Sequence, residues 1–175
     1  MDVQNRTAEK TIEVNAEAQL RLLIPTEIAR ISVIAANAMR VLSTCSNTSE
    51  LLPAVQGLSD HISVWYDGLP QSAKVDELFH TPWDETRCTL SYVHMGHLGA
   101  ITLIFRRTLS MYKHRSREQQ NPTHPDERAR LIAIFNDGIA AAKQASHILY
   151  LFLGEQAGIR HCWSVMYVLP STLLS

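Results

Sequence analysis

The sequence predicts an all-α protein, a bundle of about five to six helices, on three observations. Seven glycines and seven prolines in 175 residues leave long uninterrupted stretches. Within these stretches apolar residues recur at spacings of three and four, the period of a helix with one buried face. Nowhere do apolar and polar residues alternate between turn signals, as they do in a half-buried strand.

The composition is that of a folded domain. Apolar residues make up 46% of the chain and charged residues 19%, with a net charge of −1. A disordered chain has few apolar residues and a high net charge, so general disorder is excluded. A dedicated nucleic-acid-binding domain carries a basic excess, which this chain lacks.

The N-terminal part, residues 1–49, is expected to hold more than one helix. Pro25 marks a helix start, because the first turn needs no intrahelical N–H. That helix should end before Ser43. A further helix, capped by Thr48, Ser49 and Glu50, should run to about Asp67.

The middle of the chain should be one long helix, residues 86–114, preceded over 71–85 by a loop with a short helical turn. Its main apolar stripe is Leu90, Val93, His94, His97, Ile101, Ile104 or Phe105, Thr108, and Met111 or Tyr112. Opposite this stripe lie Met95, Leu98 and Leu103. A helix that is apolar nearly all round must be buried on all sides.

The polar tract 113–128 predicts an exposed loop, and Pro125 a new helix start. The apolar face expected on that helix is Leu131, Ile134, Phe135, Gly138, Ala142, Ala145, Leu149 and Phe152. A short apolar segment, 161–169, follows. Trp65, Leu69 and Tyr92 are expected to be buried core residues.

The candidate chemical groups favour structural roles. The adjacent carboxylates at 76–77, 84–85 and 126–127 point in different directions on a helix and suit solvated helix starts. His161 and Cys162 are sequence neighbours, a poor arrangement for a nucleophile and its base. The basic residues at 106–107 and 113–117 are typical of a solvated helix end, with a nucleic-acid patch as the alternative.

His94 and His97 are three residues apart on one helix, with Cys88 earlier, and could share a metal. A working site needs three or four convergent ligands, so core histidines hydrogen-bonded to a loop or helix carbonyl are favoured. Together with Cys45 and Cys162, Cys88 is expected to be a reduced thiol. We expect no catalytic residue, no cofactor and no metal.

No apolar leader follows Met1, and the longest uncharged run, 88–105, is too short and polar to span a membrane. The chain is therefore expected to be soluble and intracellular, without a membrane partner.

Four blocks resemble the regulatory middle region of fungal zinc-cluster transcription factors. They are Trp-Tyr-Asp-Gly-Leu-Pro at 65–70, the helix 90–107 that closes on Arg-Arg, the alanine-rich run 140–145, and Cys-Trp-Ser-Val-Met-Tyr at 162–167. Three positions depart from the pattern: Thr108 stands for a proline, Gly138 for a cysteine and Lys143 for an arginine.

This resemblance covers residues 50–168 and leaves 169–175 as a tail. It implies a regulatory or interaction domain, acting in the nucleus on RNA polymerase II transcription, that lacks its own zinc-cluster DNA-binding domain. The fold would then be a truncated part of a larger α-helical domain. The partners expected are proteins or a second copy through an apolar helical surface, and a small-molecule effector, without direct DNA binding.

The alternative is a stand-alone α-helical small-molecule-binding protein or enzyme, with His94, His97 and His114 around a pocket. Stoichiometric metal, or a ligand-dependent thermal shift with turnover, would favour it. A third reading is an unstable fragment without independent function, which would show no cooperative unfolding.

Overall fold

The computed structural model describes residues 2–80, 84–118 and 125–154, and over these ranges it is all-α, without a strand. The predicted helical bundle is confirmed. In chain order the elements are α1 (Asp2–Thr44), α2 (Thr48–Asp67), the 3₁₀ turn η1 (Gln71–Ala73), α3 (Val75–His80), α4 (Glu85–Glu118) and α5 (Pro125–Gly154).

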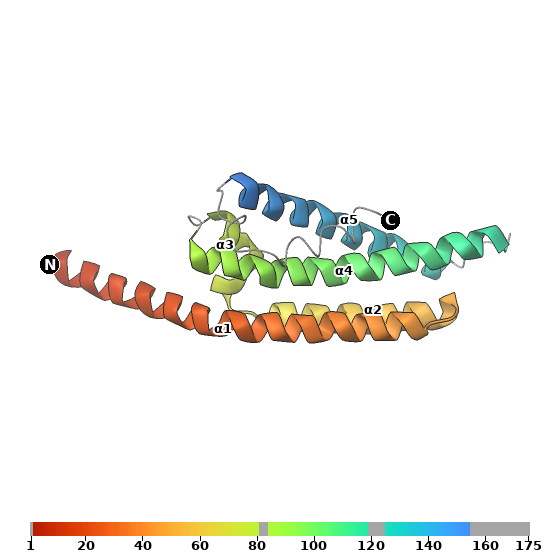
Figure 1. The fold of residues 1–175 in the computed structure, drawn as a ribbon, viewed down its shortest axis with the longest axis horizontal. Coiled ribbons are helices and arrows are strands. Elements are labelled where there is room, and N and C mark those ends of the chain that lie inside the picture. Colours follow the sequence, from red (N-terminus) through yellow and green to blue (C-terminus); the bar gives the residue numbers. More distant parts are fainter. Residues whose placement is uncertain (1, 81–83, 119–124, 155–175) are drawn as a thin grey trace.

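Helix α4 lies at the centre of the bundle, with α1 and α2 along one side and α5 along the other (Figure 1). Helices α1 and α4 run in one direction, and α2 and α5 run back. The most extensive contacts join α4 to α1 and to α5, and α2 packs on both α1 and α4. Since α2 and α5 scarcely touch each other, a strip of α4 between them is left open.

The central place of α4 follows from its sequence. Leu90, Val93 and His94 on the main stripe are buried, and so is Leu98 outside it. The prediction that this helix is buried on all sides is met only in part, because Met95 and Leu103 are half-buried and a strip of the helix lines an open groove. Its neighbours contribute to two core clusters, one around Leu20, Leu78 and Leu90, the other around Ile31, Leu51 and Ile104.

Helix α1 corrects the expectation that several helices occupy residues 1–49. It is continuous from Asp2 to Thr44, and Pro25 lies inside it rather than at a start. The side chain of Pro25 is exposed, while Leu20 and Ile24 before it are 3% and 2% exposed. Because Leu20 and Ile24 extend the buried stripe of Ile31, their burial outweighs the hydrogen bond that the proline removes.

Helix α2 has nearly the predicted bounds, but its cap lies one residue before the predicted Thr48. The side chain of Asn47 accepts a 2.9 Å hydrogen bond from the backbone N–H of Glu50. Asparagine is among the best N-cap residues, since it satisfies an otherwise unpaired donor of the first turn. Pro53 lies inside the helix near its start, as predicted.

The predicted loop over residues 113–128 is too long at its start, because α4 continues to Glu118, whereas the predicted helix start at Pro125 is confirmed. The hydroxyl of Tyr112 donates to the carboxylate of Glu127, which ties the two helices together. Residues 119–124 lie outside the described part, as does the predicted segment 161–169.

The carboxylate pairs occupy helix starts, as predicted. The first turn of α3 holds Asp76 and Glu77, and that of α5 holds Asp126 and Glu127. Ahead of α4, the side chain of Asp84 accepts a 2.7 Å hydrogen bond from the backbone N–H of Arg87. Negative charge at these positions stabilises a helix through its dipole.

The buried face of α5 is shifted by one residue from the prediction at two places. Leu131 and Gly138 are buried as predicted, but Ala141 and Ile148 are buried in place of Ala142, which is exposed, and Leu149, which is half-buried. The side chain of Phe152 lies outside the described part. The cause is a close approach to α4: a Cβ added to Gly138 would lie 2.4 Å from Cγ of Phe105. A larger side chain at this position has no room.

Two helices are long and apolar enough to cross a membrane by length and composition, Glu17–Thr44 and Glu85–Lys113. The second contains the run 88–105, and the expectation that this run is too short and polar to span a membrane is wrong by this criterion. The apolar window of the first helix is 28% buried in the bundle, and that of the second is 39% buried.

Candidate functional site

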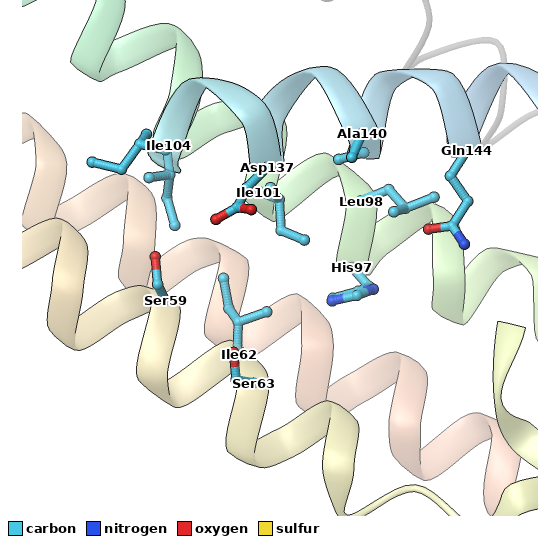
Figure 2. Close-up of a pocket in the computed structure, with 12 residues that line it drawn as sticks. Ser59, Ile62, Ser63, His97, Leu98, Ile101, Ile104, Asp137, Ala140 and Gln144 are labelled. Carbon is cyan, nitrogen blue, oxygen red and sulfur yellow. The ribbon is translucent and has the colours of Figure 1, made fainter. Parts of the chain in front are cut away.

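A half-open groove of 320 Å³ lies over α4, between α2 and α5. It exists because α2 and α5 scarcely touch, so side chains of all three helices border one space (Figure 2). The lining residues are Ser59, Ile62 and Ser63 of α2; His97, Leu98, Ile101 and Ile104 of α4; and Ile134, Asp137, Ala140, Ala141 and Gln144 of α5.

Helical periodicity sets the character of each wall. On α4 the spacing of His97, Leu98, Ile101 and Ile104 forms one apolar strip, which is the floor. On α5 the lining residues Ala140 and Ala141 have small side chains, which take up little of the space. Volumes of this size hold small molecules, and a few polar groups on an apolar lining are typical of their binding sites.

His97 borders the groove with its ring stacked on Tyr66, at 4.7 Å between centroids and 14° between planes. The ring of Trp65 lies 5.6 Å from it. Burial lowers the pKa of His97 to about 4, because the charged form loses hydration. At neutral pH His97 is therefore an uncharged, polar part of the lining.

His94, one turn earlier, is a core residue rather than part of the groove. It is fully buried, and its Nε2 lies 3.0 Å from the carbonyl oxygen of Ala73 in η1. The prediction of a core histidine bonded to a loop or helix carbonyl is confirmed for His94. Burial, and then the charge of His97, lower its pKa to about 4.

Nδ1 of His94 is buried without a hydrogen-bond partner. Since Nε2 faces a carbonyl oxygen, it carries the proton, and Nδ1 is left as an acceptor. Beside it, the hydroxyl of Tyr66 accepts a 3.3 Å hydrogen bond from Val75 N, and burial raises the pKa of Tyr66. Trp65, Tyr66, His94 and His97 form a histidine cluster that joins α2, η1 and α4 at one end of the groove.

The metal and catalytic candidates of the sequence do not converge within the described residues. No group of three or more His, Cys, Asp or Glu side chains able to hold a metal occurs there. Neither Cys45 nor Cys88 forms a disulfide bond. The side chains of His114, His161 and Cys162 lie outside the described part.

The core prediction for three residues is confirmed in one case and partly met in two. Leu69 is buried at 5% exposure. Trp65 and Tyr92 are only partly buried, although both pack against the core. The indole N–H of Trp65 donates a hydrogen bond to the buried Glu27 of α1.

One member of the basic run has a structural role. Arg107 donates from Nε to the carbonyl oxygen of Leu42 at 3.1 Å, and from a terminal nitrogen to that of Cys45 at 3.4 Å. The last carbonyls of a helix lack intrahelical partners, and a cation there is stabilising. Arg107 thus caps the end of α1 instead of forming part of a solvated helix end.

Sequence reasoning missed Asp137, although it supplies the carboxylate of the groove. No lysine or arginine is among the lining residues. Asp137 takes part in neither the Arg21–Glu17 nor the Arg30–Glu27 ion pair. No motif surrounds Asp137, so only the packing of α5 on α4 brings it to notice.

Comparisons of the chain with protein-family models, with curated proteins and with solved structures found no match.

Proposed function

We propose that this chain is the regulatory, ligand-responsive module of a transcription factor that acts in the nucleus. The observation that carries the proposal is the groove between α2 and α5. Its 320 Å³ and apolar floor suit a small-molecule effector. The resemblance of residues 50–168 to the fungal regulatory region supplies the transcriptional context.

Regulation follows if a ligand in the groove joins two helices that otherwise scarcely touch. A ligand that contacts both α2 and α5 stabilises the arrangement in which they face each other. Because the ligand binds this arrangement more tightly than others, its binding raises the fraction of molecules that adopt it. A partner that recognises the same arrangement then senses the ligand.

The partner in this proposal is a second copy of the chain, bound through α1. Leu22, Val33 and Met39 on this helix are 79%, 69% and 60% exposed. Leu22, Ala29, Val33 and Ala36 follow spacings of seven, four and three, so they share one face. If two copies of α1 pair antiparallel about Ala29, Leu22 of one meets Ala36 of the other, large against small.

The pairing is tested by the mass of the protein in solution, using Leu22→Glu and the control Val64→Glu. Val64 is a 71% exposed apolar residue of α2, outside the proposed interface. We expect a dimer for wild type and Val64→Glu, and a monomer for Leu22→Glu. A monomeric wild type at high protein concentration would refute the pairing.

The regulatory role is tested by fusing the chain to an unrelated DNA-binding domain and measuring reporter transcription. Ala140→Trp fills the groove from an exposed position, and Ala142→Trp places the same side chain on an exposed, non-lining position of α5. Ala140→Trp should change reporter output, and Ala142→Trp should leave it at the wild-type level. Equal output from the wild-type fusion and the DNA-binding domain alone would contradict the role.

Direct DNA binding by the isolated chain is not part of the proposal. The net charge is −1, and Arg107 is engaged at the end of α1. The stand-alone enzyme remains an alternative that the measurement of metal content in the Discussion addresses.

A further inference from the structure

The lining of the groove includes one charged side chain, Asp137, beside an otherwise apolar floor. Asp137 supplies a carboxylate from α5, and the lining contains no lysine or arginine. The nearest turns of α5 hold Ala133, Ile134, Ala140 and Ala141, none of which can pair with it. In the described structure the Asp137 carboxylate therefore faces the groove without a cation.

The other walls supply no cation. From α2 the lining residues are Ser59, Ile62 and Ser63, which are uncharged. His97 on the floor is uncharged at neutral pH, since burial lowers its pKa to about 4. Among the described residues the lining thus holds one negative charge, that of Asp137, and no positive charge to balance it, which favours a cationic ligand.

The shape of the groove defines the rest of the ligand. Ile62, Leu98, Ile101 and Ile104 offer an apolar surface beside the carboxylate. In Figure 2 Asp137 projects from α5 into the space that Ser59 and Ile62 border from α2. An ammonium group at Asp137 would lie within the groove while an apolar body covers the isoleucines.

We propose that the ligand of this groove is a small amphipathic amine, a protonated alkyl- or arylamine whose ammonium pairs with Asp137 and whose apolar body packs on the α4 floor. This inference rests on the groove being an effector site, and it adds the chemical class of the effector. An anionic ligand would meet Asp137 without a compensating cation, and a neutral one would leave the carboxylate unused.

The test compares three probes of one shape: 4-phenylbutylamine, 4-phenylbutan-1-ol and 4-phenylbutanoate. Binding to the full chain is measured by calorimetry at neutral pH and low salt. An exposed ion pair contributes up to about 1 kcal/mol, so the amine should bind roughly fivefold more tightly than the alcohol. The carboxylate should bind most weakly, and added salt should reduce the advantage of the amine.

Two variants separate the pairing from a general charge effect. Asp137→Asn should bring the amine to the affinity of the alcohol. Asp76→Asn removes an equal charge from an exposed position in the first turn of α3 and should leave the difference intact. Loss of the difference in both variants would overturn the assignment to Asp137.

The amine proposal and the proposed regulatory function can fail separately, and the measurements tell the two failures apart. Equal binding of amine and alcohol, abolished by Ala140→Trp, would overturn the cationic class and leave the groove as an effector site. Selective amine binding without any change of reporter output would support the amine site and contradict the regulatory function. Tightest binding of the carboxylate, or no binding of any probe at millimolar concentration, would overturn the amine proposal.

Discussion

The indole Nε1 of Trp65 donates a 2.8 Å hydrogen bond to Oε2 of Glu27, a residue with only 4% of its surface exposed. The other carboxylate oxygen of Glu27 accepts from Arg30 at 3.0 Å. A buried charge is costly unless it is paired and hydrogen-bonded, and both oxygens here have a partner. This contact joins α1 to α2 beside the histidine cluster.

Trp65→Phe should therefore destabilise the protein by more than its small change in volume implies. The phenyl ring keeps most of the packing, but Oε2 of Glu27 loses its donor while it stays buried. Leaving a buried acceptor unsatisfied costs about 1–3 kcal/mol, and more when the group is charged. Denaturant unfolding followed by circular dichroism measures the loss.

The control is the pair formed by Glu27→Gln alone and Glu27→Gln combined with Trp65→Phe. A neutral amide is less costly to leave unpaired than a carboxylate, so the tryptophan substitution should cost less when Glu27→Gln is already present. A Trp65→Phe variant within about 0.5 kcal/mol of wild type would show that this hydrogen bond contributes little.

Gly138→Ala should destabilise the contact of α4 with α5. The added Cβ would lie 2.4 Å from Cγ and 2.5 Å from Cβ of Phe105, atoms close to the backbone that cannot swing away. Overpacking of this kind typically costs about 1–3 kcal/mol. The measurement is the free energy of unfolding from denaturant titration.

Gly57→Ala is the matched control, since nothing lies within 4 Å of a Cβ added to this exposed position of α2. Alanine is the better helix former, so this variant should gain up to about 1 kcal/mol. If Gly138→Ala also gained stability, the close approach of α5 to Phe105 would be refuted.

The same glycine illustrates what the sequence could and could not predict. Periodicity alone predicted the all-α fold and the main apolar stripe of α4. It placed Ala142 rather than Ala141 inside, because the rotation of α5 depends on how closely Gly138 approaches Phe105. That distance is a property of two packed helices and leaves no trace in the spacing of either one.

Pro25 and Asp137 were misjudged for a related reason. Local rules place a proline at a helix start, but burial of Leu20 and Ile24 on its N-terminal side extends α1 through it. Asp137 is one acidic residue among many in the sequence. Only the separation of α2 from α5 makes it the carboxylate of a groove.

Stability should fall steeply with pH below the ordinary histidine range. The pKa of His94 and of His97 is lowered from 6.5 to about 4 in the folded state, chiefly by burial. A lowered histidine pKa means that the unfolded chain binds protons first as the pH falls. The stability contributed by the neutral rings is therefore present above pH 6.5 and lost between pH 6.5 and 4, by about 3 kcal/mol for each ring.

The test is denaturant unfolding between pH 7.5 and 4.5 for wild type, His97→Phe and His61→Asn. His97→Phe keeps an aromatic ring against Tyr66 but removes one titrating group, so its pH dependence should be about half as steep. His61 is exposed on α2, and its variant should follow wild type. A His97→Phe variant as steep as wild type would contradict the assignment.

His94→Gln should preserve more stability than His94→Ala, because the amide nitrogen of glutamine can reach the position of Nε2 and donate to the carbonyl of Ala73. Alanine leaves that carbonyl without its donor and opens a cavity in the core. Loss of a large buried side chain typically costs about 2–5 kcal/mol, and retention of the hydrogen bond should recover roughly 1 kcal/mol. Equal stability of the Gln and Ala variants at position 94 would show that this hydrogen bond does not contribute to stability.

Metal analysis of the purified wild type should find no zinc or iron near one per chain, since His94 is held by a carbonyl and His97 stacks on Tyr66. Stoichiometric metal that disappears in both His94→Gln and His97→Gln would instead favour the helical enzyme.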